Sequence, residues 1–453
     1  MRFPASRLEL PSWLYRQAVP AAGALTVGSL LALLLTQGRN PGYWVVAIEA
    51  LLPVLFVFPE VFLGIYQGGI LENIRFLPAG TDSRFLPFLT AAVAAAYLAR
   101  RWPRLPRITP NLMLVSQFVL WALFIVGLSY SSEPDRGLTF VTRFAYYHLL
   151  LLALPFLFHD DPKTLRRLIY AFGATSMLVG LSSLLAFQKL MSQAVIVYSE
   201  VLAVDERILG SGVIFVEWLL VSQKKLGFWR LPLAAVLVVL FFSVALLGRR
   251  GILIGTVLAA LLCPVLAGRL RPKGIAGLGL AIAVLFLSFQ LIPGFQQSKL
   301  FDEESYTGTY TSTQARVTIF NDAIGEIQES LILGYGTGAG AITGLGEGIT
   351  PYLHNIFLEI GYQVGIIGVL VFCLFLFGVA ISSLRIVVDG GGGHERRNLG
   401  ILLLGWFIVF LVPAQLSYDL MGNRTLWFIA GLIGAVCASP PAAWRKDRVP
   451  NRV

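Results

Sequence analysis

Residues 355–384 read NIFLEIGYQVGIIGVLVFCLFLFGVAISSL, and Glu359 is the only charged residue among them. A helix rises about 1.5 Å per residue, so roughly 20 apolar residues cross the hydrocarbon core of a bilayer. In lipid every backbone polar group needs a partner within the protein, which a helix supplies by itself. The stretch is therefore predicted to be a membrane-spanning helix.

Apolar runs of similar character recur along the whole chain. Of the 453 residues, 56% are hydrophobic and 13% are charged, about half the charged share of a typical soluble domain. The sequence predicts an all-α polytopic integral membrane protein with about 12 transmembrane helices and no soluble domain of ordinary size. The runs lie at about residues 18–36, 43–66, 86–99, 111–130, 138–158, 167–187, 210–222, 231–247, 251–268, 274–292, 355–384, 398–417 and 425–440.

The net charge of +10 is concentrated in short basic connections that are separated from one another by two spans. Lys and Arg are retained in cytoplasmic loops, so all of these connections are predicted to lie on the cytoplasmic side. This explains the basic balance without a nucleic-acid partner. The topology of the first two runs stays open, because Arg2 and Arg7 favour a cytoplasmic N-terminus, while counting spans back from Arg100 favours an N-terminus outside. The connections are residues 100–107, 163–167, 224–230, 269–273, 385–397 and 445–448.

One connection on the other side is long, and it divides the chain into three parts. Residues 1–292 form the first part of the helical bundle, residues 293–354 an extracytoplasmic loop, and residues 355–453 the last spans with a basic tail. Loops of this length are usually functional. Within the loop we predict a helix over 315–330, followed by a glycine-rich stretch that is too flexible to be helical. The expected apolar stripe of this helix is Val317, Phe320, Ile324 and Ile327.

Several arginines fall on the outer side, where the positive-inside pattern does not explain them. They are Arg143, Arg207, Arg249, Arg250 and Arg316. Charges near the hydrocarbon region are costly and are functional candidates, and the guanidinium fork donates two parallel hydrogen bonds to phosphate oxygens. Their convergence would suit an anion held at the membrane surface. The alternatives are headgroup contacts for Arg249 or Arg250, a buried pair of Arg143 with Asp419, and a solvated position for Arg316.

Three segments, in order, resemble the O-antigen ligase and O-antigen polymerase superfamily of bacterial membrane glycosyltransferases. LGRRG at 247–251 is similar to the family's SRG signature at the start of a span. SLILGYG at 330–336, after the helix that Arg316 opens, is similar to the family's glycine-containing loop motif. HN at 354–355, with Leu358, Glu359 and the glycines of 361–368, is similar to a third motif. Together these segments cover about residues 235–375.

The resemblance implies a glycosyltransferase of the GT-C type in the bacterial cytoplasmic (inner) membrane, with its active site facing the periplasm. The donor would be a glycan on undecaprenyl diphosphate, and the acceptor another lipid-linked glycan or lipid A core. The family is taken to use no metal or nucleotide cofactor. Membrane lipids would surround the site, and a chain-length regulator stays open as a further partner.

The mechanism that we expect uses side-chain charge in place of a metal. Arg249 or Arg250, together with Arg316, would stabilise the leaving diphosphate, with Arg143, Arg207 and Asn355 as further diphosphate-binding residues. His354 would be the general base for the acceptor hydroxyl, because a histidine titrates near neutral pH. In the alternative assignment His354 binds the diphosphate, and Glu359 or Asp322 is the base.

Three further functional alternatives remain at this stage. Arg207 and Gly210 match a ligase motif, but Ser211, Gly212 and Val213 replace its Asn-Pro-Asn, which favours a polymerase over a ligase. A polysaccharide or lipid flippase would usually show internal repeats, and none is visible. A metal-dependent enzyme would use the acidic run at 302–304, which is more typical of a solvated loop.

Overall fold

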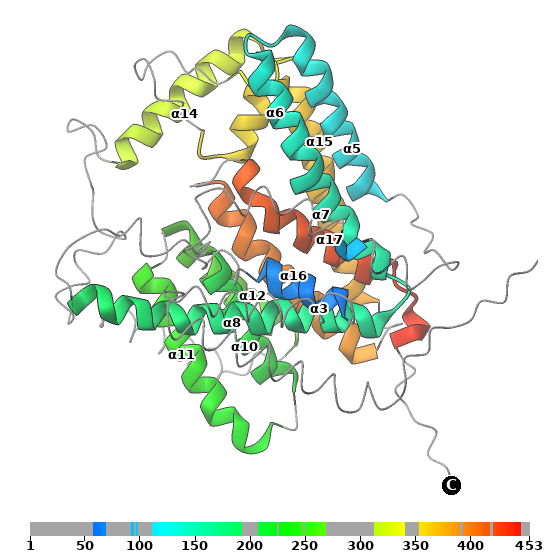
Figure 1. Ribbon diagram of the computed structural model, residues 1–453, viewed down its shortest axis with the longest axis vertical. Helices are drawn as coiled ribbons and strands as arrows, with labels where there is room; N and C mark the ends of the chain where they lie inside the picture. The colour runs from blue at the N-terminus through cyan, green and yellow to red at the C-terminus, as the bar shows by residue number, and fades with distance from the viewer. Residues whose placement is uncertain are drawn as a thin grey trace, which may run out of the picture.

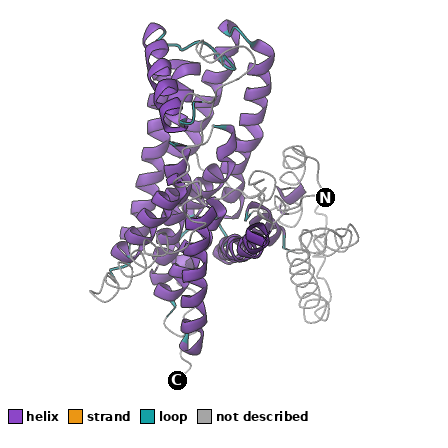
Figure 2. Ribbon diagram, turned by 90° about the vertical axis from the view of Figure 1, so that its left-hand side faces the viewer, coloured by secondary structure: helices purple, strands orange, loops and turns teal. Residues whose placement is uncertain are grey.

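The computed structural model describes residues 58–68, 92–94, 97, 111–192, 207–223, 226–247, 250–268, 312–339, 353–389, 393–416 and 420–444 (Figure 1). For 184–192, 246–247 and 312–316 the description covers the backbone alone. Every regular element in these ranges is a helix, as Figure 2 shows, so the all-α prediction is confirmed for them.

The helices of the first half are α3 (Pro59–Gln67), α5 (Leu112–Gly127), η3 (Leu128–Tyr130), α6 (Pro134–Phe144), η4 (Ala145–Leu149), α7 (Leu150–Ala153), η5 (Leu154–Phe158) and α8 (Pro162–Ser192). Those of the second half are α10 (Arg207–Ser222), η6 (Gly227–Trp229), α11 (Arg230–Leu247), α12 (Arg250–Leu266), α14 (Ser312–Glu329), α15 (Ile356–Val388), α16 (Gly393–Ala414), η9 (Met421–Asn423), α17 (Arg424–Ala438) and η10 (Pro441–Trp444).

Six helical stretches in the described residues are long and apolar enough to cross a membrane. The shorter apolar helix α12 adds to them. The count of about 12 spans stays a prediction. The runs at 18–36 and 274–292 lie outside the described residues, and α8 and α10, which hold the runs 167–187 and 210–222, are not among the six stretches. The six stretches are Leu112–Tyr130, Pro134–Phe158, Gly227–Ala245, Ile356–Val388, Gly393–Ala414 and Met421–Ala438.

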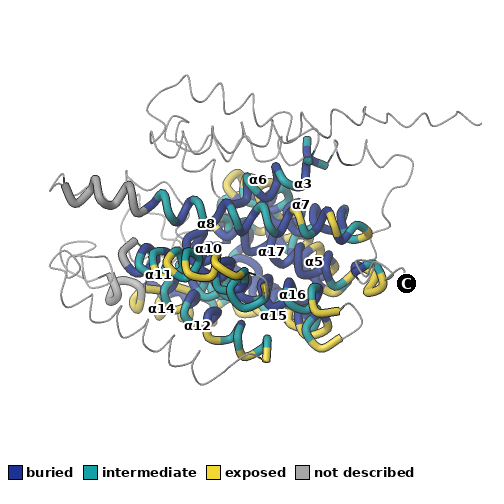
Figure 3. The backbone as a smooth tube through the Cα atoms, turned by 90° about the horizontal axis from the view of Figure 1, so that it is seen from below, coloured by how far each residue is buried: buried dark blue, intermediate teal, exposed yellow. Residues whose placement is uncertain are grey.

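The core of the bundle lies around α17, which is coloured as buried at the centre of Figure 3. Trp427 of α17 and Trp406 of α16 are both fully buried. Large apolar side chains on outer helices are exposed instead, for example Phe228 beside α11 and Phe377 of α15. Apolar side chains both in the core and on the outer surface are what a lipid solvent allows, because an exposed apolar side chain costs nothing against acyl chains.

Two of the basic connections, 163–167 and 385–397, meet at one end of the bundle, which we call the basic end. Arg166, at the start of α8, pairs with Glu395 at the start of α16, with 2.6 Å between Nε and Oε1. Arg397 donates to the carbonyl of Leu266 at the end of α12 (2.8 Å), and Arg396 to that of Cys437 at the end of α17 (2.9 Å). The starts of α12 and α17 and the end of α16 therefore lie at the opposite end, which we call the site end.

The second apolar run is interrupted where the sequence places Pro59 and Glu60. Helix α3 begins at Pro59, and Glu60 is buried. The Glu60 carboxylate lies 3.3 Å from the guanidinium of Arg167 on α8, which compensates its charge. Residues 43–57 of the run lie outside the described residues.

Helix α15 is two helical segments, residues 356–363 and 366–388, joined at Val364 and Gly365. Gly365 has φ of +68°, outside the helical region. The two segments contact each other on either side of this turn. Near the turn, a Cβ added at Gly368 would lie 2.9 Å from Ile360, and farther from it the rings of Phe357 and Phe372 are 5.1 Å apart. The segments are therefore antiparallel. The expectation of one continuous span starting at 355 is corrected to a helical hairpin.

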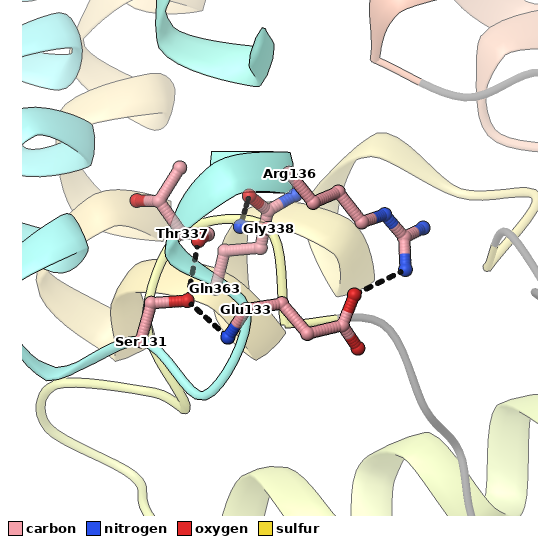
Figure 4. A network of polar contacts seen from close by, with 6 residues as sticks. All are labelled: Ser131, Glu133, Arg136, Thr337, Gly338 and Gln363. Atoms are coloured by element: carbon pink, nitrogen blue, oxygen red, sulfur yellow. Dashed lines mark hydrogen bonds and ion pairs between the residues drawn. The ribbon is translucent and has the colours of Figure 1, made fainter. Parts of the chain in front are cut away.

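Polar contacts fix the glycine-rich loop 334–339 over the tip of this hairpin. The amides of Tyr335 and Gly336 donate to the carbonyls of Tyr362 and Gln363, at 2.8 and 3.0 Å. The Gly338 amide donates to the Gln363 side chain (3.1 Å), as Figure 4 shows. The carbonyl groups that the break in α15 exposes are thus satisfied by the loop.

The same loop is attached to the end of α5 and the start of α6. Thr337 donates from its hydroxyl to the carbonyl of Phe124 (2.7 Å), and Ser131 donates to the carbonyl of Thr337 (2.8 Å). Ser131 also accepts from the amide of Glu133, whose carboxylate pairs with Arg136 at 3.3 Å (Figure 4). The loop therefore connects α14 firmly to two spans.

The predicted loop helix is present as α14, and the predicted apolar stripe is right for Phe320 and Ile327, which pack against its buried face, but wrong for Val317 and Ile324. Val317 and Ile324 are exposed, whereas Ile319 and Ala323 are buried against Leu353 and Tyr362. Apolar residues occur on several faces of this helix, so periodicity alone did not select the buried one. Packing on the first segment of α15 selected Ile319 and Ala323.

Candidate functional site

The connection between α16 and α17 receives side chains from three other helices. It runs from Gln415 to Asn423, of which 415, 416 and 420–423 are described. Asn355 caps the first segment of α15 by accepting from the Leu358 amide (3.1 Å), and its Nδ2 donates to the carbonyl of Gln415 (3.1 Å). One turn later, Glu359 accepts from the amide of Leu420 (2.5 Å). Two polar side chains thus dock the start of the hairpin on the connection.

Arg207 is held against the same connection from α10. It begins this helix and is 2% exposed. Its guanidinium donates to Oδ1 of Asn423 and to the carbonyl of Gly422 (2.6 Å), and it lies over the Phe410 ring, 5.5 Å from the centroid. A buried arginine is tolerated where its donors are satisfied. These contacts leave Arg207 with a fixed orientation.

Arg250 lies at the start of α12, next to a residue that packs against the connection. Its side chain is exposed, and the next residue, Gly251, lies against Pro413 and Leu416 at the end of α16. A Cβ at Gly251 would lie 3.3 Å from both of these residues, so the helices approach closely here. Arg249 lies outside the described residues, and Arg250 is the described member of the pair.

His354 precedes the cap residue and has an unusual backbone. Its φ is +52°, the left-handed region that few residues other than glycine adopt. Such conformations cost free energy and cluster at functional sites. The residue is partly exposed, while Nδ1 of its ring is buried. It precedes Asn355, whose side chain contacts the connection.

The remaining candidates lie less centrally, or their side chains are not described. Arg143 is exposed in the last turn of α6, a helix that contacts η9. Its possible partner Asp419 lies outside the described residues. Arg316 belongs to the first turns of α14, and its side chain lies outside the description. Asp322 is exposed on α14.

Some residues at the connection were not predicted from the sequence. Asn423 and the backbone groups of Leu420 and Gly422 hold Glu359 and Arg207. His148, which the sequence places deep in a span, contacts the Leu420 carbonyl at 3.0 Å. A polar residue such as Asn423 just before the last span was a visible signal, but backbone partners leave no trace in a sequence.

The chemistry at the connection combines cations, amides, a carboxylate and an imidazole. Guanidiniums and amides bind anionic oxygens, while a carboxylate or imidazole accepts a proton from a hydroxyl group. In the described part of the chain, no three His, Cys, Asp or Glu side chains gather as metal ligands. The arrangement therefore suits binding of a phosphate-containing substrate next to a proton acceptor.

Comparison with known families agrees with this chemistry. Residues 235–373 match the family model described as O-antigen ligase. The matched region contains Arg250, His354 and Glu359 and the start of the hairpin, so the resemblance to the O-antigen ligase and polymerase superfamily is confirmed. Members of this family are glycosyltransferase-like membrane enzymes, and the apolar helices agree with a multi-pass bacterial membrane protein. The comparison with curated proteins gives no match.

Proposed function

We propose that this protein transfers glycan from a polyprenyl-diphosphate-linked donor on the periplasmic face of the cytoplasmic membrane. The observation that carries the proposal is the convergence of Arg207, Asn355 and Glu359 on the α16–α17 connection, with Arg250 at the same end. The family match supports the reaction class. The geometry supports an anion site at a membrane-embedded hairpin.

The reaction that we propose is attack of an acceptor hydroxyl on the anomeric carbon of the donor. The glycosidic bond to the acceptor forms while the bond from the anomeric carbon to the diphosphate oxygen breaks. Arg250 and Arg316 stabilise the charge that develops on the leaving diphosphate, and Arg207, buried against Gly422 and Asn423, holds the connection beside them. His354 accepts the hydroxyl proton, or Glu359 does so if His354 binds the phosphates.

A polymerase is the favoured form of the proposal, because the Asn-Pro-Asn of the ligase motif is replaced at 211–213. The purified protein in proteoliposomes is given an undecaprenyl-diphosphate-linked repeat unit alone, or with lipid A core as acceptor. Growth of lipid-linked polymer without the core supports a polymerase, and product on the core alone supports a ligase.

The same preparation tests the other classes. We expect EDTA to leave the glycan-transfer activity unchanged. Loss of this activity in EDTA would indicate the metal-dependent alternative. Movement of the lipid-linked donor across the bilayer without any new glycosidic bond would overturn the proposal in favour of a flippase.

A further inference from the structure

His148 lies on a local irregularity of the second membrane-spanning stretch. Residues Ala145–Leu149 form a π-helix between α6 and α7. Such widened turns are rare, interrupt the regular hydrogen-bond ladder, and occur frequently at functional sites. The His148 side chain that this turn presents is fully buried.

The surroundings of the His148 ring leave it one polar contact among the described residues. Phe144 and Trp427 pack edge-on against it, with ring centroids 4.4 and 4.8 Å away. Nε2 lies 3.0 Å from the carbonyl oxygen of Leu420, and Nδ1 has no hydrogen-bond partner in the described part of the chain. A carbonyl oxygen only accepts, so Nε2 carries the hydrogen and donates it.

Leu420 is the residue through which this contact reaches the site. Its amide donates to Glu359 while its carbonyl accepts from His148. Gly422 and Asn423, which follow it closely, accept from Arg207. One short segment is therefore held from α15, η4 and α10 at once, and it carries the contacts of both Glu359 and Arg207.

We propose that His148 is a positioning residue for the glycan-transfer site. Its Nε2–H group holds the Leu420 carbonyl and so fixes the segment 420–423 against Glu359 and Arg207. The proposal rests on the proposed function for its effect on turnover. The positioning of residues 420–423 by His148 is argued from the hydrogen bonds alone.

A pair of variants separates hydrogen bonding from packing. Gln and Met have similar length and volume, but only the Gln side chain donates a hydrogen bond. Small misplacement of reacting groups costs up to about 10²-fold in rate. We expect His148→Met to lower kcat by about 10-fold to 100-fold with a smaller change in KM for the donor. His148→Gln should stay within about threefold of wild type, since it keeps the donor.

His159 supplies a matched control at the basic end. Its Nδ1 also contacts a backbone carbonyl, that of Phe156 at 2.7 Å. His159→Met should leave kcat unchanged, because this contact is remote from the α16–α17 connection. Equal loss of turnover in His148→Met and His148→Gln would overturn the proposal, since packing alone would then explain it.

A readout without activity distinguishes this proposal from the proposed function. Hydrogen–deuterium exchange of the peptide that contains 420–423 should be faster in His148→Met than in wild type, and unchanged in His148→Gln. If wild type transfers no glycan but this pattern holds, the positioning role stands and the proposed function fails. If exchange is the same in both variants, the positioning role fails.

Discussion

At the residue scale, the arginines of the site differ in what their loss removes. Arg207 is buried and makes its contacts within the chain, whereas Arg250 is exposed at the start of α12. Truncating Arg207 leaves buried acceptors unsatisfied, a cost of about 1–3 kcal/mol. Stability and activity are therefore coupled at Arg207 and separable at Arg250.

Arg250→Ala and Arg316→Ala are expected to abolish glycan transfer while the protein still folds. The leaving diphosphate loses a charge-assisted contact in each case. Arg→Lys should rescue poorly, because an ammonium does not donate two parallel hydrogen bonds. Transfer is measured with purified protein, and thermal unfolding in detergent serves as the control. Full activity in both alanine variants would remove the diphosphate assignment.

His354→Ala is expected to lower turnover by about 10² to 10⁴-fold, the usual contribution of general-base catalysis, while donor binding survives. A general base acts in its unprotonated form, so the wild-type rate should fall on the acid side of the profile. The measurements are donor affinity and a rate profile from about pH 5.5 to 8. A flat profile with lost donor binding in His354→Ala would make His354 a diphosphate ligand and Glu359 the first candidate for the base.

The sequence predicted the charged part of the site better than its scaffold. Arg207, Arg250, Asn355 and Glu359 stand out because polar residues at the ends of apolar runs are costly. Their partners on the connection are largely backbone groups, which every sequence has. The roles of these residues remain proposals, while their proximity at the site end is a feature of the structure.

At the element scale, the hairpin of α15 was not predictable from its composition. The run 355–384 is equally apolar whether it is straight or folded back, and hydropathy carries no direction. Gly365 is the residue that permits the reversal, because its φ of +68° disfavours any side chain. A glycine within a long apolar run is common in membrane helices, so it gave no sufficient signal.

Gly365→Ala is expected to destabilise the protein by about 2 kcal/mol or more, since strained backbone of this kind costs about 1–3 kcal/mol. A Cβ there would also lie 2.1 Å from the carbonyl oxygen of Ile332. Thermal unfolding in detergent measures the effect. The matched control is Gly325→Ala on α14, where nothing lies within 4 Å, and helix propensity predicts a gain of up to about 1 kcal/mol. An equal unfolding temperature for Gly365→Ala and Gly325→Ala would contradict the interpretation of Gly365 as a strained turn.

At the scale of the whole molecule, the meeting of the basic connections 163–167 and 385–397 at one end fits the positive-inside pattern. Arg166, Arg396 and Arg397 contact other helix ends there, and the α16–α17 connection lies at the other end. The order of basic clusters along the sequence predicted this for the two connections, and the side of the other basic connections stays a prediction. The connectivity of the first two runs stays a prediction.

Labelling from outside the cell tests the orientation. In a variant without Cys263, Cys373 and Cys437, a single cysteine at Gln328 on α14 should react with an impermeant maleimide in intact cells. One at Gln223, after α10, should react only after the cells are opened. Both positions are exposed in the structure. The reverse pattern would place the arginines of the site in the cytoplasm and end the proposal for a periplasmic reaction.

The reversal in α15 also changes where a lipid-borne substrate would have to be brought. At about 1.5 Å per residue, the start of the first segment lies on the order of 10 Å back from the hairpin tip, toward the basic end. An isoprenoid tail pulled out of the bilayer costs about 0.8 kcal/mol for each CH₂ group that enters water. In the proposed reaction the phosphates would be bound near the depth of His354, while the tail keeps its place among the acyl chains. The polar sugar would then have to move below the membrane surface, and its hydroxyl groups need a hydrated route down to the same level.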